Sequence, residues 1–233
     1  MRLAHQLAAL AAAAAGLLGP PGGPAAAAPA ATRAPPAAER RATAVLETSQ
    51  GVIVIALRAD AAPRTVANFE ALVAAGFFDG TYFHRVVPGF VIQGGNPHTR
   101  NQDPSDDGRG GPATTVPAEI GLPHLRGAVA AARFDDRINP ERGSHGSQFF
   151  IDLAPQPSLD RAGYTVFGEV VEGMEVIDRI AALAWVPGTA KGAAGPNPGR
   201  EALIRRTRLE ALAPRATAGG RTRTEPSRPV ATD

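Results

Sequence analysis

The chain has 233 residues, with 24 Lys and Arg against 22 Asp and Glu, and it contains no cysteine. This length allows one sizeable domain with tails, and the lack of cysteine excludes disulfides and a lipid anchor on a cysteine. Residues 44–210 carry 16 Lys and Arg against 19 Asp and Glu, a net charge of −3, so the basic character of the chain comes from its ends. No basic stretch is interleaved with aromatic residues, and we therefore expect no nucleic-acid partner.

The first thirty residues have the pattern of a secretory signal peptide. Met1-Arg2 is a short positive start, residues 7–18 are an Ala/Leu run, and Ala28-Pro29-Ala30 is a small-x-small cleavage pattern. The apolar run is too short to cross a bilayer. We therefore expect residues 1–30 to be removed and the mature protein to be periplasmic or secreted, without stable membrane insertion. The alternative is an Ala/Pro-rich disordered start of a cytosolic protein.

Two more segments show no apolar periodicity. Residues 31–42 are rich in Pro, Ala and Arg, and residues 213–233 in Gly, Pro, Thr and Arg. We predict a disordered linker and a disordered basic tail, with the folded domain between them at residues 43–212. The arginines of the tail allow contact with an anionic membrane surface, but a solvated tail is the favoured interpretation.

The domain is predicted to begin with a hairpin and a helix. Residues 44–48 and 51–57 are expected as two strands joined by a turn at Ser49-Gln50-Gly51. Pro63 starts a helix that ends before Gly76. The apolar face of this helix is Val66, Phe69, Leu72 and Val73.

The rest of the domain is predicted to consist mainly of short strands. A polar segment at 97–117 is expected as a surface loop, and loops of that length are often functional. A second helix is expected over 174–184. Further strands are predicted at 128–132, 148–153, 164–170 and 202–209. Many short strands with two helices favour an all-β barrel or sandwich over a βαβ repeat.

The most informative stretch is residues 83–95, F-H-R-V-V-P-G-F-V-I-Q-G-G. The Pro88-Gly89 turn separates two apolar clusters, which predicts two short strands that meet at a bend. Arg85 is the single charged residue among them. A guanidinium is costly to bury unpaired, so Arg85 requires a partner or a function. The alternative is an ordinary strand arginine whose charged end reaches solvent.

Two further motifs follow, G-S-Q-F-F-I at 146–151 and V-F-G-E-V-V-E-G-M at 166–174. In this order the three motifs resemble the signature of the cyclophilin family of peptidyl-prolyl cis-trans isomerases, over about residues 43–212, and the bacterial exported members in particular. The resemblance implies a mainly β fold, a closed eight-stranded antiparallel barrel capped by two α-helices. It also implies an isomerase without a cofactor, acting as a monomer on X-Pro bonds of exported, folding polypeptides.

By matching position, the resemblance places the catalytic arginine at Arg85. It implies that Gln93 and Ala132 bind the peptide backbone. The proline pocket it implies is lined by Phe90, Val91, Phe150, Leu159 and Tyr164. For Phe90 and Phe150 the alternative is ordinary core packing, and Arg133 is left out of the site because the family usually has asparagine there.

The chain departs from the family pattern at the rim of this pocket. Ser158 stands where many members have tryptophan, and Tyr164 where many have histidine, a substitution that resembles bacterial exported members. The only tryptophan, Trp185, lies at the end of the second predicted helix. We therefore expect large cyclic inhibitors such as cyclosporin to bind more weakly than they bind to tryptophan-bearing relatives.

Other kinds of site have little support in the sequence. The histidines after the signal peptide, His84, His98, His124 and His145, lack the spacing of metal ligands, so no metal site is expected. Ser144 and Ser147 flank His145, but no third group indicates a hydrolase. A non-catalytic peptide-binding or scaffold domain remains open at this point, although the presence of Arg85 and its neighbouring motif residues favours the enzyme.

Overall fold

The structure is a computed structural model that describes residues 42–101, 103, 105–112, 114–183 and 198–211. The expected signal peptide, the C-terminal tail and Trp185 lie outside these residues, as does the expected linker except for Ala42. Ala42 is already the first residue of strand β1.

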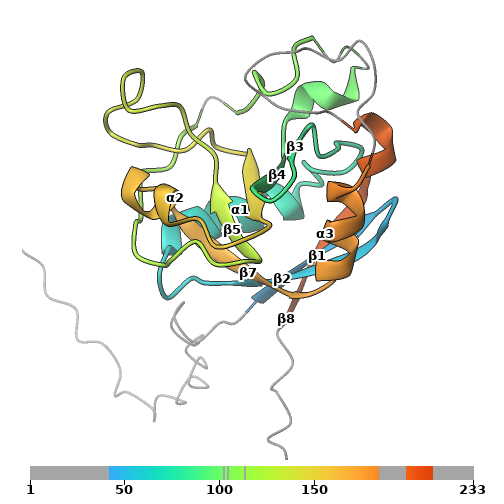
Figure 1. Cartoon of the computed structure of the whole chain (residues 1–233), viewed down its shortest axis with the longest axis horizontal. Helices are drawn as coiled ribbons and strands as arrows, with labels where there is room; N and C mark the ends of the chain where they lie inside the picture. The colour runs from blue at the N-terminus through green and yellow to red at the C-terminus, as the bar shows by residue number, and fades with distance from the viewer. Residues whose placement is uncertain (1–41, 102, 104, 113, 184–197, 212–233) are drawn as a thin grey trace, which may run out of the picture. The chain divides into compact units, whose positions relative to one another are not determined.

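Eight antiparallel strands of the described residues form one strongly curled sheet (Figure 1). The strands are β1 Ala42–Thr48, β2 Gly51–Leu57, β3 Arg85–Val87, β4 Val91–Gly94, β5 Ala128–Ala131, β6 Phe149–Asp152, β7 Val166–Glu172 and β8 Ile204–Ala211. Their order in the sheet is β3-β4-β6-β5-β7-β2-β1-β8. The predicted mainly β, eight-stranded antiparallel fold is therefore confirmed.

The two ends of the sheet meet through a few backbone contacts. Tyr82, just before β3, and Leu203, just before β8, form an isolated antiparallel bridge. Beside it, the Ile204 amide donates to the Thr81 carbonyl at 2.8 Å. The sheet is thus closed by one bridge and its flanking hydrogen bonds, and not by a full ladder between β3 and β8.

Three α-helices accompany the sheet in the described residues, one more than predicted. They are α1 Pro63–Ala74, α2 Pro157–Ala162 and α3 Met174–Ala181, with 3-10 turns η2 Pro97–Arg100 and η3 Gly199–Ala202. Helix α3 ends three residues before the predicted end at 184, although Leu183 still packs against the core. Helix α2 has six residues, too few to show an apolar periodicity. Pro157 in the first turn marks its start, and Gly163 at φ 71° marks its end.

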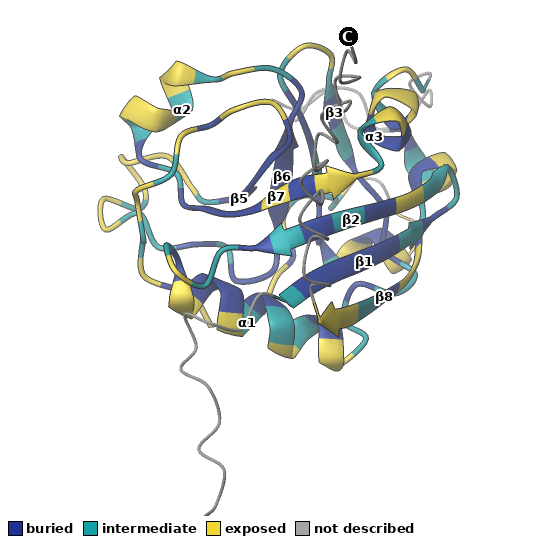
Figure 2. Ribbon diagram, turned by 90° about the horizontal axis from the view of Figure 1, so that it is seen from below, coloured by how far each residue is buried: buried dark blue, intermediate teal, exposed yellow. Residues whose placement is uncertain are grey.

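The interior of the curled sheet is filled by apolar side chains. Figure 2 shows buried residues along β1 and β2, whereas α2 is mostly exposed. Phe69 of α1 packs against Phe78 and Phe149, with ring centres 5.1 and 5.6 Å apart. Because this interior has no room for a substrate, a ligand has to bind on the outer face.

A carboxylate from a distant loop caps the start of α1. The helix has no side-chain cap of its own, since residue 62 is alanine. Glu119 accepts hydrogen bonds from the backbone amides of Arg64 at 3.0 Å and Thr65 at 2.8 Å, and from the Thr65 hydroxyl at 2.8 Å. A negative charge at this end also interacts favourably with the helix dipole.

Replacing this cap tests its contribution. We expect Glu119→Ala to lower the free energy of unfolding by about 1–2 kcal/mol, because amides at the start of α1 lose their acceptor. Urea denaturation followed by circular dichroism measures the change. Glu119→Gln, which keeps one acceptor oxygen, should lose less, and Glu141→Ala on an exposed loop serves as the control. Equal stability of Glu119→Ala and the unmodified protein would show that solvent replaces the cap.

Candidate active site

Four side chains form a row across the outer face of the sheet. Arg85 on β3 is directly opposite Gln93 on β4, Gln93 is opposite Phe150 on β6, and Phe150 is opposite Ala130 on β5. Directly opposed residues of an antiparallel sheet present their side chains on the same face. The register therefore brings Arg85, Gln93 and Phe150 together from segments that lie up to 65 residues apart in the sequence.

The alternation of the strands separates two apolar clusters. Val86, Ile92 and Ile151, the neighbours of the row, belong to the interior core. The outer cluster consists of buried Val91, Ala128, Ala130, Ala132, Phe150 and Val166, with half-buried Phe90, Leu122, Leu159 and Tyr164 packed against them. Every residue expected to line the proline pocket lies in this outer cluster, together with Ala132.

Turns and the short helix α2 supply the outer rim of this cluster. Phe90 follows the turn at Gly89, and its amide donates to the Val87 carbonyl at 2.9 Å. Leu159 lies on α2, and Tyr164 follows Gly163 at the end of that helix. The Phe150 and Tyr164 rings meet edge to face at 5.6 Å. Ser158, also on α2, is exposed.

Arg85 stands at the edge of the outer cluster with its charge uncompensated. It is half-buried, and within the described residues its guanidinium makes no hydrogen bond or ion pair. Its contact is with the Phe90 ring, whose centre lies 5.8 Å from Cζ. Burial lowers the pKa of Arg85, but a guanidinium keeps its charge in proteins. Its N–H donors are thus available to a ligand on the cluster.

A hydrogen-bonded chain of two glutamines orients Gln93. Its Nε2 donates to Oε1 of buried Gln148 at 2.9 Å. Gln148 in turn donates to the carbonyls of Gly108 at 3.0 Å and Gly110 at 2.7 Å. This chain uses the amide nitrogen of Gln93 and leaves its side-chain oxygen as an acceptor. Gln148 was not among the expected site residues, although it lies in the motif at 146–151.

The backbone of Ala132 is already engaged within the protein. Its amide donates to the Gln148 carbonyl at 2.9 Å, and its carbonyl accepts from the His145 amide at 2.8 Å. A carbonyl oxygen has two lone pairs, so one acceptor position remains at Ala132. The amide, in contrast, has no second hydrogen to offer a peptide.

Arg133, which the sequence did not indicate as a site residue, packs against the outer cluster. Its Cζ lies 4.4 Å from the centre of the Tyr164 ring, and its side chain is only 4% exposed. The guanidinium is held by the carbonyl of Ala162 and by the carboxylate of Asp136 at 2.6 Å. Arg133 thereby helps to hold the Tyr164 ring in place, and no feature of its polar loop in the sequence indicates this contact.

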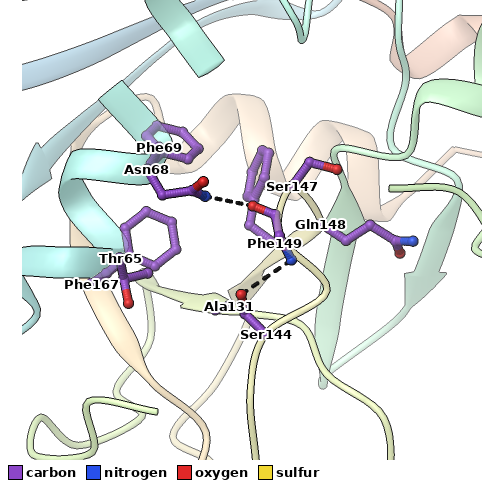
Figure 3. Close-up of a pocket in the computed structure, with 10 residues that line it drawn as sticks. Thr65, Asn68, Phe69, Ala131, Ser144, Ser147, Gln148, Phe149 and Phe167 are labelled. Atoms are coloured by element: carbon purple, nitrogen blue, oxygen red, sulfur yellow. Dashed lines mark hydrogen bonds between the residues drawn. The ribbon is translucent and has the colours of Figure 1, made fainter. Parts of the chain in front are cut away.

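A small cavity lies behind the outer face, between α1 and residues 144–149 (Figure 3). Its volume is about 10 Å³, enough for one water molecule. Asn68 of α1 donates to the Gly146 carbonyl at 2.6 Å, and the Gly146 amide donates to the Ser144 hydroxyl at 3.1 Å. These bonds anchor the segment that carries Gln148 and thus support the site from behind.

The described residues contain no group of three or more His, Cys, Asp and Glu side chains arranged to hold a metal ion. None of the helices they form is long and apolar enough to pass through a membrane.

A curled eight-stranded antiparallel sheet with an arginine beside an outer apolar cluster agrees with the cyclophilin class of protein. The family model described as cyclophilin type peptidyl-prolyl cis-trans isomerase/CLD matches residues 43–202, more than half of the chain. The chain belongs to the cyclophilin-type peptidyl-prolyl cis-trans isomerases.

Individual relatives agree with this family. "Peptidyl-prolyl cis-trans isomerase A" of Dickeya dadantii is 42% identical over 141 residues, which cover 59% of this chain and 70% of that protein. "Peptidyl-prolyl cis-trans isomerase" of Synechococcus elongatus is 41% identical over 156 residues, covering 63% and 98%. A crystal structure of a Cryptosporidium parvum cyclophilin-type isomerase, obtained in the presence of the dipeptide Ala-Pro, matches with a TM-score of 0.60 and 26% identity, covering 72% of this chain and 99% of that one.

The family match and the named relatives decide between an isomerase and a non-catalytic scaffold domain. The chain is a peptidyl-prolyl cis-trans isomerase whose substrates are proline-containing peptides. The alternative of a scaffold domain without chemistry is therefore set aside.

Next to Arg85, a buried histidine should make the fold sensitive to acid. His84 is only 2% exposed. Burial, together with the charge of Arg85, lowers the pKa of His84 to about 4. The unfolded chain therefore takes up a proton that the folded protein does not. The contribution of His84 to stability is complete above pH about 6.5 and is lost as the pH falls towards about 4.

Substitution of His84 tests this pH dependence. We expect His84 to account for a loss of about 3 kcal/mol in unfolding free energy between pH 7 and pH 4. Urea denaturation at a series of pH values measures the loss, and it should be smaller by that amount in His84→Gln. If both proteins lose stability equally with pH, His84 does not remain neutral in the fold.

Proposed function

We propose that the outer cluster is the proline pocket of this isomerase and that Arg85 is its catalytic residue. The observation that carries the proposal is the half-buried guanidinium of Arg85, which has no acceptor among the described residues and lies beside an apolar surface. A charge left uncompensated in such a place costs stability, and binding or catalysis explains why it is there.

The chemistry requires no nucleophile and no metal. The barrier to rotation about an X-Pro bond, about 18–20 kcal/mol, comes from the partial double-bond character of the amide. Twisting the bond localises the lone pair on the prolyl nitrogen. A cationic donor placed there binds the twisted amide more strongly than the planar one, and this difference lowers the barrier.

The row of side chains on the outer face provides the necessary spacing. Adjacent strands are about 4.8 Å apart, so Arg85 on β3 and Phe150 on β6 are separated by about 10 Å at the backbone. A proline ring placed over Phe150 then has its nitrogen within reach of the long Arg85 side chain. The Phe90 ring beneath Cζ restrains the movement of the guanidinium.

The polar groups around the pocket are proposed to hold the peptide backbone. The side-chain oxygen of Gln93 accepts a peptide N–H, and the free lone pair of the Ala132 carbonyl provides a second acceptor. Val91, Leu159 and Tyr164 complete the apolar wall. A pocket that contacts one proline ring and some backbone selects weakly among sequences, and we expect a broad range of client polypeptides.

Substitution of Arg85 tests the assignment. We expect Arg85→Ala to lower kcat/KM by at least about tenfold in a protease-coupled assay on an Ala-Pro peptide. Arg85→Lys should also fall, because lysine keeps the charge but not the planar guanidinium with its several donors. The thermal midpoint should not fall, since within the described residues Arg85 makes no hydrogen bond or ion pair that the fold would lose.

Arg109→Ala is the matched control for this experiment, because Arg109 is an exposed arginine on the loop between β4 and β5. It should retain the activity of the unmodified enzyme. A folded Arg85→Ala protein with near-normal turnover would show that the guanidinium is not catalytic.

We further propose that the enzyme acts as a monomer outside the cytoplasm, in the periplasm or after secretion. The support is the charged start, the short apolar run and the Ala28-Pro29-Ala30 pattern of the first thirty residues. The family match begins at residue 43, which is consistent with a signal peptide and linker before the domain. The clients would then be exported polypeptides that have not finished folding.

Fractionation of a bacterial host that expresses the full chain tests this location. We expect the protein in the periplasm or medium, with a mature N-terminus at about residue 31 by mass spectrometry. A variant without residues 1–30 should stay in the cytoplasm with full isomerase activity. Uncleaved full-length protein in the cytoplasm would contradict export.

A further inference from the structure

A buried histidine–carboxylate pair lies against the proposed proline pocket. The side chains of His124 and Asp152 are both 0% exposed, and Nδ1 of His124 lies 2.8 Å from Oδ2 of Asp152. The mechanism proposed above uses neither residue. His124 comes from the loop before β5, and Asp152 is the last residue of β6.

The imidazole of His124 supports the aromatic wall of the pocket. Its ring is nearly parallel to that of Phe150, with an angle of 13° and 5.8 Å between centres. It is perpendicular to the Tyr164 ring at 6.4 Å. Asp152 is two residues beyond Phe150 on the same strand, so both side chains leave the same face of the sheet.

Backbone hydrogen bonds connect the same loop to the rest of the pocket rim. The His124 amide donates to the Asp160 carboxylate at 2.8 Å, and its carbonyl accepts from the Gln156 amide at 2.8 Å. The Gln156 side chain donates to the carbonyl of Gly89 at 3.1 Å. The loop of His124 is thus tied to α2, which carries Leu159, and to the turn before Phe90.

Stability alone does not explain this pair. Within the described residues, Nε2 of His124 and Oδ1 of Asp152 are buried without a hydrogen-bond partner. Burial also raises the pKa of the Asp152 carboxyl, against the opposing effect of its bond to His124. Apolar residues of similar volume are often as stable or more stable at such a position. The hydrogen bond does, however, fix the rotation of the imidazole, which an apolar pair would not do.

We propose that His124 and Asp152 are positioning residues for prolyl isomerisation: their hydrogen bond sets the plane of the imidazole, and that plane sets the position of Phe150 under the substrate proline. The inference rests on the proposed function, in which Phe150 is part of the pocket. A small displacement of a pocket wall changes how well the twisted amide meets Arg85, and such displacements can strongly reduce turnover.

Two substitutions of Asp152 separate the hydrogen bond from the charge. Asp152→Asn keeps an oxygen acceptor for the Nδ1–H of His124, and we expect its kcat/KM to stay within about threefold of the unmodified enzyme. Asp152→Leu removes the acceptor, and we expect a loss of about tenfold or more. A loss in Asp152→Asn as large as in Asp152→Leu would overturn the proposal, because it would show that the charge and not the hydrogen bond matters.

A double substitution separates positioning from a merely structural role. His124→Phe with Asp152→Leu replaces the pair by apolar side chains and keeps a ring against Phe150. We expect its thermal midpoint to lie within about 3 °C of the unmodified protein or above it, while kcat/KM stays about tenfold low. Recovery of activity together with stability would show that the pair only fills the interior, and the proposal would be wrong.

A direct readout of Phe150 and a matched control complete the experiment. Without the hydrogen bond that fixes the imidazole, the Phe150 ring should flip faster in Asp152→Leu than in Asp152→Asn, and aromatic NMR measures both rates. Equal rates would contradict the proposal. His98→Phe removes the contact of exposed His98 with half-buried Asp106 at 3.2 Å and should leave kcat/KM unchanged. Normal turnover in Arg85→Ala and Phe150→Ala would refute the site itself, whereas the inference alone fails if those two lose activity and Asp152→Leu does not.

Discussion

The alternation of side chains along three short strands is the constraint on which the rest of the structure depends. On β3, β4 and β6, Val86, Ile92, Phe149 and Ile151 enter the interior core, whereas the alternate residues lie on the outer face, where Val91 and Phe150 join the outer cluster. A shift of one residue in any of these ladders would turn Arg85 into the core and Val86 out to the solvent. The same register that fills the interior with apolar side chains therefore also builds the proposed site.

The polar groups of the site are positioned by contacts that lie outside those strands. Gln148 orients Gln93, Arg133 packs on Tyr164, and the bond between His124 and Asp152 holds an imidazole against Phe150. Gln148, His124 and Asp152 are buried, so the loss of one of these side chains would leave a hydrogen-bonding partner unsatisfied. Arg85, in contrast, is left without such a partner among the described residues, and this combination is what electrostatic stabilisation of a twisted amide requires.

Much of the fold could be predicted because its signals are local. The turn at Pro88-Gly89, the proline that starts α1 and the apolar runs of the strands all act over a few residues. Helix α2 was missed because six residues show no apolar periodicity. Arg133 and Gln148 were missed as supports of the site because their partners, Tyr164 and Gln93, are 31 and 55 residues away in the sequence.

The sequence by itself determined the class of the protein, since three motifs in one order identify the family and place Arg85, Phe90 and Phe150 by position. It also showed that a charge stands among strand residues, because this is a matter of composition and spacing. Only the tertiary structure decided that Arg85 has no carboxylate partner among the described residues and that His124 meets Asp152 in the interior. The physical reason is that burial and hydrogen bonding depend on which distant segments lie side by side in the sheet. Alternation along one strand determines the face that each of its side chains takes, but not which strand pairs with it.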